Sequence, residues 1–144
     1  MNKKYELIES DIKGLYRIRA SRRINYFVAE EDIGGYVQAE SNLSQAGTCW
    51  IYGNAKVMEN AKILDYAEVL ENSTIKGYAK VMENASVYDN AEISGTAVIA
   101  GHSDIRGNAK IINATILDSF IEGDVNIHSG ACINESSSNL TKMP

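Results

Sequence analysis

The chain has 144 residues, of which 23% are charged and 44% are hydrophobic, a composition ordinary for one soluble domain. Its formal net charge of −5 argues against nucleic acid as a partner, and no apolar stretch is long enough for a membrane span or a signal peptide. Two cysteines cannot form a disulfide framework, so we expect a cytoplasmic protein. From the charge and the apolar stretches we expect that it binds neither nucleic acid nor membrane.

The first 36 residues contain no repeat, and we expect them to form a small β-structured cap. Aromatic and branched residues favour short strands over residues 5–8, 15–20 and 26–28, with charged turns at 21–23 and 30–32 between them. A cap is needed because the first coil of a repeat fold has an open strand edge and an open apolar end.

A repeat of six residues begins at Val37 and is regular between Ile51 and Ile111, where a branched aliphatic residue occupies every sixth position. A small residue, usually alanine, stands two positions before each aliphatic one, so both side chains point to the same side of a short strand. A polar pair, often Gly, Asp or Glu followed by Asn, then predicts a corner. Short strands alternating with corners at this period are typical of an all-β parallel β-helix.

Polar residues at the corners are predicted to turn the chain and not to bind a metal. We expect positive φ at the Asn residues of the polar pairs, at positions 54, 60, 72, 84, 90 and 108. The acidic corner residues are spread over different corners, which is not how calcium ligands cluster. We expect them to be solvated turn residues: Glu59, Asp65, Glu71, Glu83 and Asp89.

The repeat is interrupted at three places. Residues 44–48 add a small loop or bulge before Ile51. After Ile111 the step shortens to five residues at Ile116 and again at Ile121, which should tighten corners or distort a coil. The polar residues that follow Ile133 predict a frayed tail and an open C-terminal strand edge.

The two cysteines are predicted to lie at opposite ends of the repeat. Cys49 occupies the inward small position before Ile51, and Cys132 should point outward beside Ile133. A disulfide within one chain is therefore not expected.

The six-residue pattern resembles the hexapeptide-repeat proteins, which fold as a left-handed parallel β-helix. In that family three hexads form one triangular coil, so the resemblance implies about five coils between Val37 and Ile133. The motifs Gly34-Gly35-Tyr36-Val37, Cys49-Trp50-Ile51-Tyr52-Gly53-Asn54-Ala55 and Tyr16-Arg17-Ile18-Arg19-Ala20 look like the YdcK-like branch of bacteria and phages, often labelled as transferases. We therefore expect a cap at 1–36, a left-handed β-helix at 37–133 and a polar tail at 134–144.

Stacking by 18 residues places outward side chains in columns, two of which are too apolar for solvated faces. One column consists of Tyr52, Leu70, Tyr88 and Arg106 and is flanked by Trp50; another contains Leu64 and Met82. Apolar columns of this kind commonly mark interfaces. They predict a homo-oligomer, either a trimer or a dimer, or contact with another protein.

These observations favour a non-enzymatic scaffold or binding module that acts through its flat faces, with no cofactor and no metal. In a phage genome such a module would serve as an inhibitor or sequestering protein for a host factor. The alternative, implied by the resemblance, is an acyltransferase that uses a coenzyme A thioester and a histidine base. His102 and His128 are the candidate bases. The uninterrupted repeat between Ile51 and Ile111 argues against this alternative, because the transferases typically extrude a loop that shapes the acceptor site.

Overall fold

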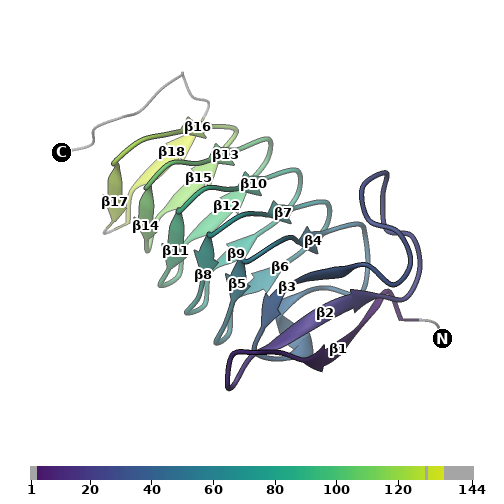
Figure 1. The fold of residues 1–144 in the computed structure, drawn as a ribbon. Helices are drawn as coiled ribbons and strands as arrows, with labels where there is room; N and C mark the ends of the chain where they lie inside the picture. Colours follow the sequence, from purple (N-terminus) through teal and green to yellow (C-terminus); the bar gives the residue numbers. More distant parts are fainter. Residues whose placement is uncertain (1–2, 129, 135–144) are drawn as a thin grey trace.

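The structure, a computed structural model, describes residues 3–128 and 130–134. This part of the chain is all-β, and its parallel strands stack as a β-solenoid of about five turns (Figure 1). The helical content of the described residues is one 3-10 turn at Glu40–Asn42. The predicted all-β class and the parallel coils are therefore confirmed.

Three sheets form the sides of the solenoid, and successive strands pass from one sheet to the next. The first sheet contains β1 (Tyr5–Glu9), β2 (Tyr16–Ala20), β3 (Ile33–Val37), β5 (Lys56–Val57), β8 (Thr74–Ile75), β11 (Glu92–Ser94), β14 (Lys110–Ile112) and β17 (Asn126–His128). The second contains β4 (Trp50–Ile51), β7 (Glu68–Val69), β10 (Ser86–Val87), β13 (Asp104–Ile105) and β16 (Phe120–Ile121). The third contains β6 (Lys62–Ile63), β9 (Lys80–Val81), β12 (Val98–Ala100), β15 (Thr115–Leu117) and β18 (Cys132–Asn134).

The interior of the solenoid is built from the two inward positions of each hexad. Every small and aliphatic residue that the repeat places there between Ile51 and Ile111 is completely buried. Parallel pairing keeps these positions stacked, as Val57 pairs with Ile75 and Ile93 with Ile111. Each coil thus adds buried apolar surface, which stabilises the fold by about 25 cal/mol per Å².

The two five-residue steps shorten corners and leave the strands in register. Ile99 still pairs with Ile116, and Ile105 with Ile121. Each shortened corner has a single positive-φ residue, Asn113 or Asp118. The side-chain oxygen of that residue accepts a hydrogen bond of 2.9 Å from a backbone N–H of the preceding coil and so takes the place of the missing corner carbonyl. We predicted that these steps would either tighten corners or distort a coil; the structure shows tighter corners and strands that stay in register.

The longer corners turn one residue earlier than predicted. Positive φ occurs at the residue before each Asn, for example at Glu71 and Asp89, so the assignment of positive φ to the Asn residues was wrong. An acidic side chain suits this position because its carboxylate accepts the backbone N–H of the equivalent corner in the next coil. Glu71 binds Asp89 N at 2.9 Å, and Asp89 binds Gly107 N at 2.8 Å. Such a charged hydrogen bond offsets the cost of a left-handed residue other than glycine.

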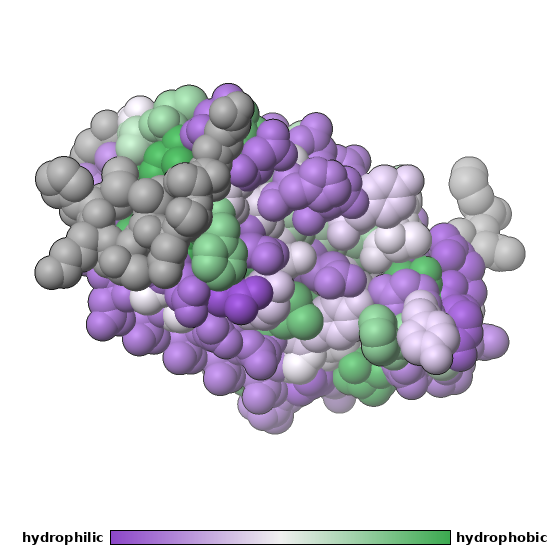
Figure 2. All heavy atoms as spheres, turned by 90° about the horizontal axis from the view of Figure 1, so that it is seen from above, coloured by the Kyte–Doolittle hydropathy of each residue, from purple (hydrophilic) through white to green (hydrophobic). Residues whose placement is uncertain are grey.

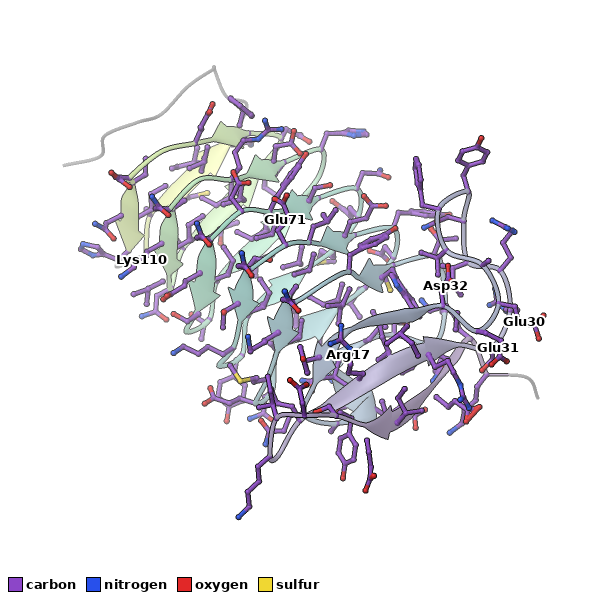
Figure 3. The ribbon with its side chains drawn as sticks, in the orientation of Figure 1. Arg17, Glu30, Glu31, Asp32, Glu71 and Lys110 are labelled. Atoms are coloured by element: carbon purple, nitrogen blue, oxygen red, sulfur yellow. The ribbon has the colours of Figure 1, made fainter. Side chains whose placement is uncertain are left out.

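Side-chain donors close the N-terminal end of the solenoid. Between the coils many backbone N–H groups donate to a carbonyl of the following coil, as Lys56 N does to Ser73 O, and others donate to the preceding coil, as Asp118 N does to Ala100 O. An uncovered first coil would therefore leave several carbonyls without donors. The cap supplies donors from the Lys4 ammonium, the Tyr5 hydroxyl and the Arg17 guanidinium. Figure 3 shows Arg17 where the cap meets the first coils. These groups bind the carbonyls of Gly34, Glu40, Leu43, Ala46, Gly47, Cys49 and Gly53.

Strand β3 joins the cap to the coils across the predicted boundary at residue 36. It pairs with β2 in the antiparallel direction and with β5 in the parallel direction, so cap and coils share one continuous sheet. Gly34 and Gly35 allow this close approach, because a Cβ at either position would lie 2.5 Å from an atom of Ile51. The predicted strands at 5–8 and 15–20 are found, whereas 26–28 is not a strand but one side of a tight loop.

The inserted residues 44–48 wrap around the fully buried side chain of Lys4, whose Nζ lies 3.4 Å from the Cys49 thiol. Burial lowers the pKa of Lys4 and raises that of Cys49. Cys49 is buried and Cys132 is exposed, as predicted. Among the described residues there is no helix of the length and apolarity that crossing a bilayer requires. The predicted tail beyond Asn134 lies outside the described residues.

Candidate functional site

The strongest surface feature is the outer side of the second sheet, which we call the aromatic face. Its centre is the column of residues that directly follow the inward aliphatic residues of this sheet. All four are half-buried already in the single chain: Tyr52, Leu70, Tyr88 and Arg106. Alternation along each short strand explains the column, because the residue next to an inward side chain points outward.

Tyr52 connects this column to the cap. Its hydroxyl accepts a hydrogen bond from Asn25 Nδ2 at 2.9 Å and donates one to Glu68 Oε2 at 3.2 Å. Burial and the neighbouring Glu68 carboxylate raise the pKa of Tyr52 to about 12. The phenol is therefore neutral and fixed in place over the whole physiological pH range.

Arg106 forms the C-terminal part of the column. Its guanidinium carbon lies 4.7 Å from the centre of the Tyr88 ring and 5.1 Å from that of the Phe120 ring. Nη2 donates to the Tyr88 hydroxyl at 3.2 Å and lies 3.6 Å from an Asp104 oxygen. Nε is buried and has no hydrogen-bond partner among the described residues. Burial and the Asp104 carboxylate raise the pKa of Tyr88.

Trp50, which was predicted to flank this column at an interface, is not on the surface. It is only 1% exposed, because the cap covers its end of the sheet and Tyr5 packs against it edge-on at 6.3 Å. The prediction was wrong because stacking by 18 residues describes neighbouring coils and cannot include a cap that has no repeat. Trp50 belongs to the closure of the N-terminal end.

Phe120 joins the aromatic face although the sequence did not indicate it. The two shortened corners place it beside Asp104 in the parallel ladder, out of step with the 18-residue spacing. Counting inward aliphatic residues instead of fixed spacings would have found it, because Phe120 directly precedes Ile121 as Asp104 precedes Ile105.

A second feature that the sequence did not indicate is the loop of residues 22–28, which we call the aromatic loop. Tyr26 is 86% exposed and Phe27 is 78% exposed, and their rings meet edge-on at 5.2 Å. The loop is held by Asn25 Oδ1, which accepts the backbone N–H groups of Phe27 and Val28, and by Arg23, which binds loop carbonyls. Neighbouring side chains of a strand point to opposite sides, so two adjacent aromatic residues cannot both face the core. This pair in the sequence could therefore have indicated that the segment is exposed.

The aromatic loop and the aromatic face are adjacent, since Asn25 bonds to Tyr52. In Figure 1 the loop before β3 stands away from the coils at the end where β4 lies. The view from above in Figure 2 looks onto the side where β4 to β16 are labelled in Figure 1, and pale and green atoms alternate with purple ones along it. Aromatic and apolar side chains mixed with arginine are common in protein interfaces.

The other predicted interface residues, Leu64 and Met82, lie on a different side of the solenoid. They follow the inward residues of the third sheet and are half-buried. A groove at the margin of this sheet includes two lysines that are direct neighbours in the ladder, and it is lined by Ser41, Asn60, Lys62, Tyr78, Lys80, Thr96 and Val98. The structure therefore does not bring all the predicted interface residues together.

The two histidines lie apart in the fold. His102 is exposed at a corner between the third and second sheets, where its backbone N–H donates to Asp118 Oδ1. His128 is exposed at the end of β17 in the first sheet. Their roles as bases under the acyltransferase alternative stay a prediction.

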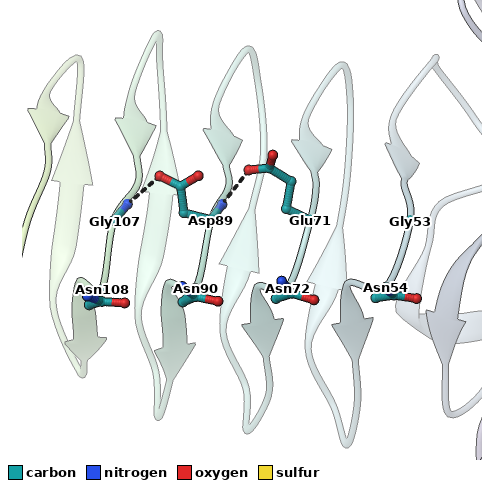
Figure 4. Close-up of a pocket in the computed structure, with 8 residues that line it drawn as sticks. All are labelled: Gly53, Asn54, Glu71, Asn72, Asp89, Asn90, Gly107 and Asn108. Carbon is teal, nitrogen blue, oxygen red and sulfur yellow. Dashed lines mark hydrogen bonds between the residues drawn. The ribbon is translucent and has the colours of Figure 1, made fainter.

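The acidic corners form a groove that is occupied by internal hydrogen bonds. Figure 4 shows Glu71 and Asp89 bound to backbone N–H groups of the next coil, with Asn54, Asn72, Asn90 and Asn108 aligned beside them. All the acidic corner residues named above accept such a bond. Residues 3–128 and 130–134 contain no group of His, Cys, Asp or Glu side chains suited to a metal ion.

Comparison with known proteins does not assign the chain to a family. No protein-family model matches the chain, and no curated protein matches it.

Proposed function

We propose that this chain is a self-associating binding scaffold whose working surface is the aromatic face. The observation that carries the proposal is the column Tyr52, Leu70, Tyr88 and Arg106, which lies outside the core, is flanked by Phe120 and ends beside the exposed aromatic loop. Tyrosine, phenylalanine and arginine are the residues that most often anchor interfaces. The spacing of the hexads and the motif Gly34-Gly35-Tyr36-Val37 support placing the scaffold among YdcK-like hexapeptide-repeat proteins.

The face is also rigid, which favours binding. Strands of the second sheet fix the backbone beneath it, and the tyrosine hydroxyls and the guanidinium are held by the hydrogen bonds described above. A side chain that is already ordered loses little conformational entropy when a partner covers it, and about 0.5–1.5 kcal/mol is saved per such side chain. The aromatic face therefore has the composition and the preorganisation of a docking surface.

The test is the mass of the protein in solution. The double variant Leu70→Asp/Tyr88→Asp places two charges in the middle of the aromatic face and should convert an oligomer into a monomer, measured by light scattering over a range of concentrations. A mass that does not change from wild type would rule out this surface as the site of self-association.

A matched control uses the first sheet. Ser94 and Ile112 are also outward residues in neighbouring coils, paired in the ladder of β11 and β14. Ser94→Asp/Ile112→Asp introduces the same charges on another outer face, at a half-buried and an exposed position, and should leave the mass unchanged. Circular dichroism on both double variants checks that each keeps its β structure.

A further inference from the structure

The aromatic face changes in character along the axis of the solenoid. Its N-terminal end carries the aromatic loop, in which Arg22 and Arg23 are exposed; Glu30, Glu31 and Asp32 are exposed in the segment that follows the loop. Its C-terminal end carries Phe120 and Glu122, with Asp124 exposed at the next corner. The loop arginines are therefore opposite in charge to the carboxylates of the C-terminal end.

We propose, building on the self-association proposed above, that the aromatic face forms an antiparallel two-fold dimer with a second copy of this chain. The two-fold axis crosses the face between β7 and β10. Leu70 of one copy then opposes Tyr88 of the second copy, and Tyr52 opposes Arg106. One coil further out, the aromatic loop covers Phe120 of the second copy. Because strands are spaced by ~4.8 Å, the contacts on the two sides of the axis match coil by coil.

A parallel pairing of the same faces is less favourable. If the column stays in contact with itself, Arg106 meets Arg106 of the second copy and Glu122 meets Glu122. If the two columns are offset to avoid this, Leu70 is buried against Glu68, which leaves a carboxylate against an apolar side chain. The antiparallel pairing avoids both, because an aromatic ring opposes each guanidinium and an apolar side chain opposes each apolar side chain.

The aromatic loop projects from the cap beside the flat aromatic face, so its rings can contact a second copy of the chain. Phe27 and Tyr26 are exposed, yet their loop is fixed by Asn25 and Arg23, so it is ordered before it binds. On the receiving side, Phe120 lies against the Arg106 guanidinium, and this stack presents an aromatic and cationic surface to an incoming ring.

Reversal of charges tests the orientation. Arg22→Glu and Glu122→Lys should each weaken the dimer about threefold to tenfold, because each reversal places like charges at both ends of the interface. The antiparallel pairing predicts recovery of wild-type affinity in the chain that carries both changes, and also in an equimolar mixture of the two single variants. Lys76→Glu, on the first sheet, is the matched control and should have no effect. A doubly changed chain that is weaker than either single variant would overturn the antiparallel orientation.

Cross-linking gives a second readout that does not depend on affinity. With Cys132→Ser as the background and Cys49 left in the core, Tyr26→Cys and Glu122→Cys are prepared as separate proteins. Mild oxidation of their mixture should give a disulfide-linked dimer, and oxidation of either protein alone should give little. A dimer of Tyr26→Cys with itself would establish the parallel orientation and overturn the proposal.

The outcomes separate the two proposals. If wild type is a monomer at every concentration, both the proposed function and the dimer fall. If Leu70→Asp/Tyr88→Asp dissociates an oligomer, but charge reversal and cross-linking do not follow the antiparallel pattern, the aromatic face remains an interface and the antiparallel dimer is wrong. If wild type is a trimer that the same double variant dissociates, the aromatic face is again an interface and the antiparallel dimer is again wrong.

Discussion

In the coils, most backbone groups of one turn are satisfied by a neighbouring turn, whereas at the N-terminal end several carbonyls of the first coil are satisfied by side chains of the cap. Lys56 N, Met58 N and their equivalents each donate to a carbonyl of the following coil. At the N-terminal end the donors are Lys4, Tyr5 and Arg17. The fully buried Asn42, in the first coil itself, donates from Nδ2 to two carbonyls of the following coil.

The difference follows from the direction of most hydrogen bonds between coils outside the strand ladders. Because most of these run from an N–H to a carbonyl of the following coil, the first coil is left with several carbonyls that no preceding coil can satisfy, and its cap supplies donors for them. Lysine, arginine and tyrosine can all donate, and they are the residues found there. Coils can therefore tolerate changes on their outer sides, while the end depends on a few side chains that have no substitute.

The largest effect is expected from the loss of one donor at the end. Lys4→Met removes the ammonium from the carbonyls of Ala46, Gly47 and Cys49, of which only the bond to Cys49 is buried, and should lower the free energy of unfolding by about 1–3 kcal/mol, the cost of a buried carbonyl without a donor. Urea unfolding measures the change. Lys3→Met is the control: its side chain is exposed and paired with Glu40, and we expect a loss of about 0–1 kcal/mol. Equal losses in the two variants would contradict the role of Lys4.

In the coils the largest effect should come from overpacking. Ala85 is completely buried in the narrow interior, and Ala85→Leu should cost about 1–3 kcal/mol or more, because well-packed side chains must move to admit it. The melting temperature reports the loss. Ala39→Leu makes the same change at an exposed position and should stay within about 0.5 kcal/mol of wild type. An unchanged melting temperature for Ala85→Leu would count against the inward placement.

A smaller effect is expected at the corners. Glu71 has φ of 61° and binds the N–H of Asp89, so Glu71→Ala loses a hydrogen bond and keeps a left-handed residue, at a cost of about 1 kcal/mol. Glu71→Gly loses the same bond but relieves the backbone, and its stability should lie between alanine and wild type. Thermal unfolding would rank the three proteins. The order would fail if alanine were more stable than glycine.

The smallest effect is a dependence on pH where the loop meets the coils. The pKa of Tyr52 is raised to about 12 by burial and by Glu68, above the value of about 10 in an unfolded chain. A raised folded pKa means that the contribution of this phenol to stability is complete below pH 10 and is lost as pH rises toward 12. Tyr52→Phe should therefore flatten the fall in stability between pH 9.5 and 11, measured by urea unfolding. A variant with the same slope as wild type would exclude Tyr52 as the source.

Sequence reasoning succeeded where one rule applied to every coil. The inward positions and the opposite exposures of Cys49 and Cys132 follow from the alternation of small and aliphatic residues at a period of six, and the resemblance to hexapeptide-repeat proteins implied three sides to each coil. It failed where the rule was replaced by contacts between distant parts of the chain. Trp50 is buried because Tyr5 lies against it, and Phe120 reaches the aromatic face because two corners are shortened.

The position of the positive-φ residue at each corner could not be predicted from local sequence preference. From composition, both members of a pair such as Glu71-Asn72 could take positive φ, and asparagine is the better candidate by intrinsic preference. The deciding factor is a hydrogen bond across coils, from the N–H of Asp89 to the Glu71 carboxylate, and its partner is 18 residues away. Local preference could not reveal it.

The sequence by itself determined the rod, because a period of six with a small and an aliphatic residue on the same side of each strand can bury its apolar surface only by stacking coil on coil. It also determined which outer columns are apolar. Only the tertiary structure decided which of those columns is covered and which is open. The cap covers Trp50 and leaves Tyr52, Leu70 and Tyr88 at the surface, and the same cap projects Tyr26 and Phe27 beside them. Burial on the outside of a solenoid depends on what folds over it, and here that is a segment without any repeat.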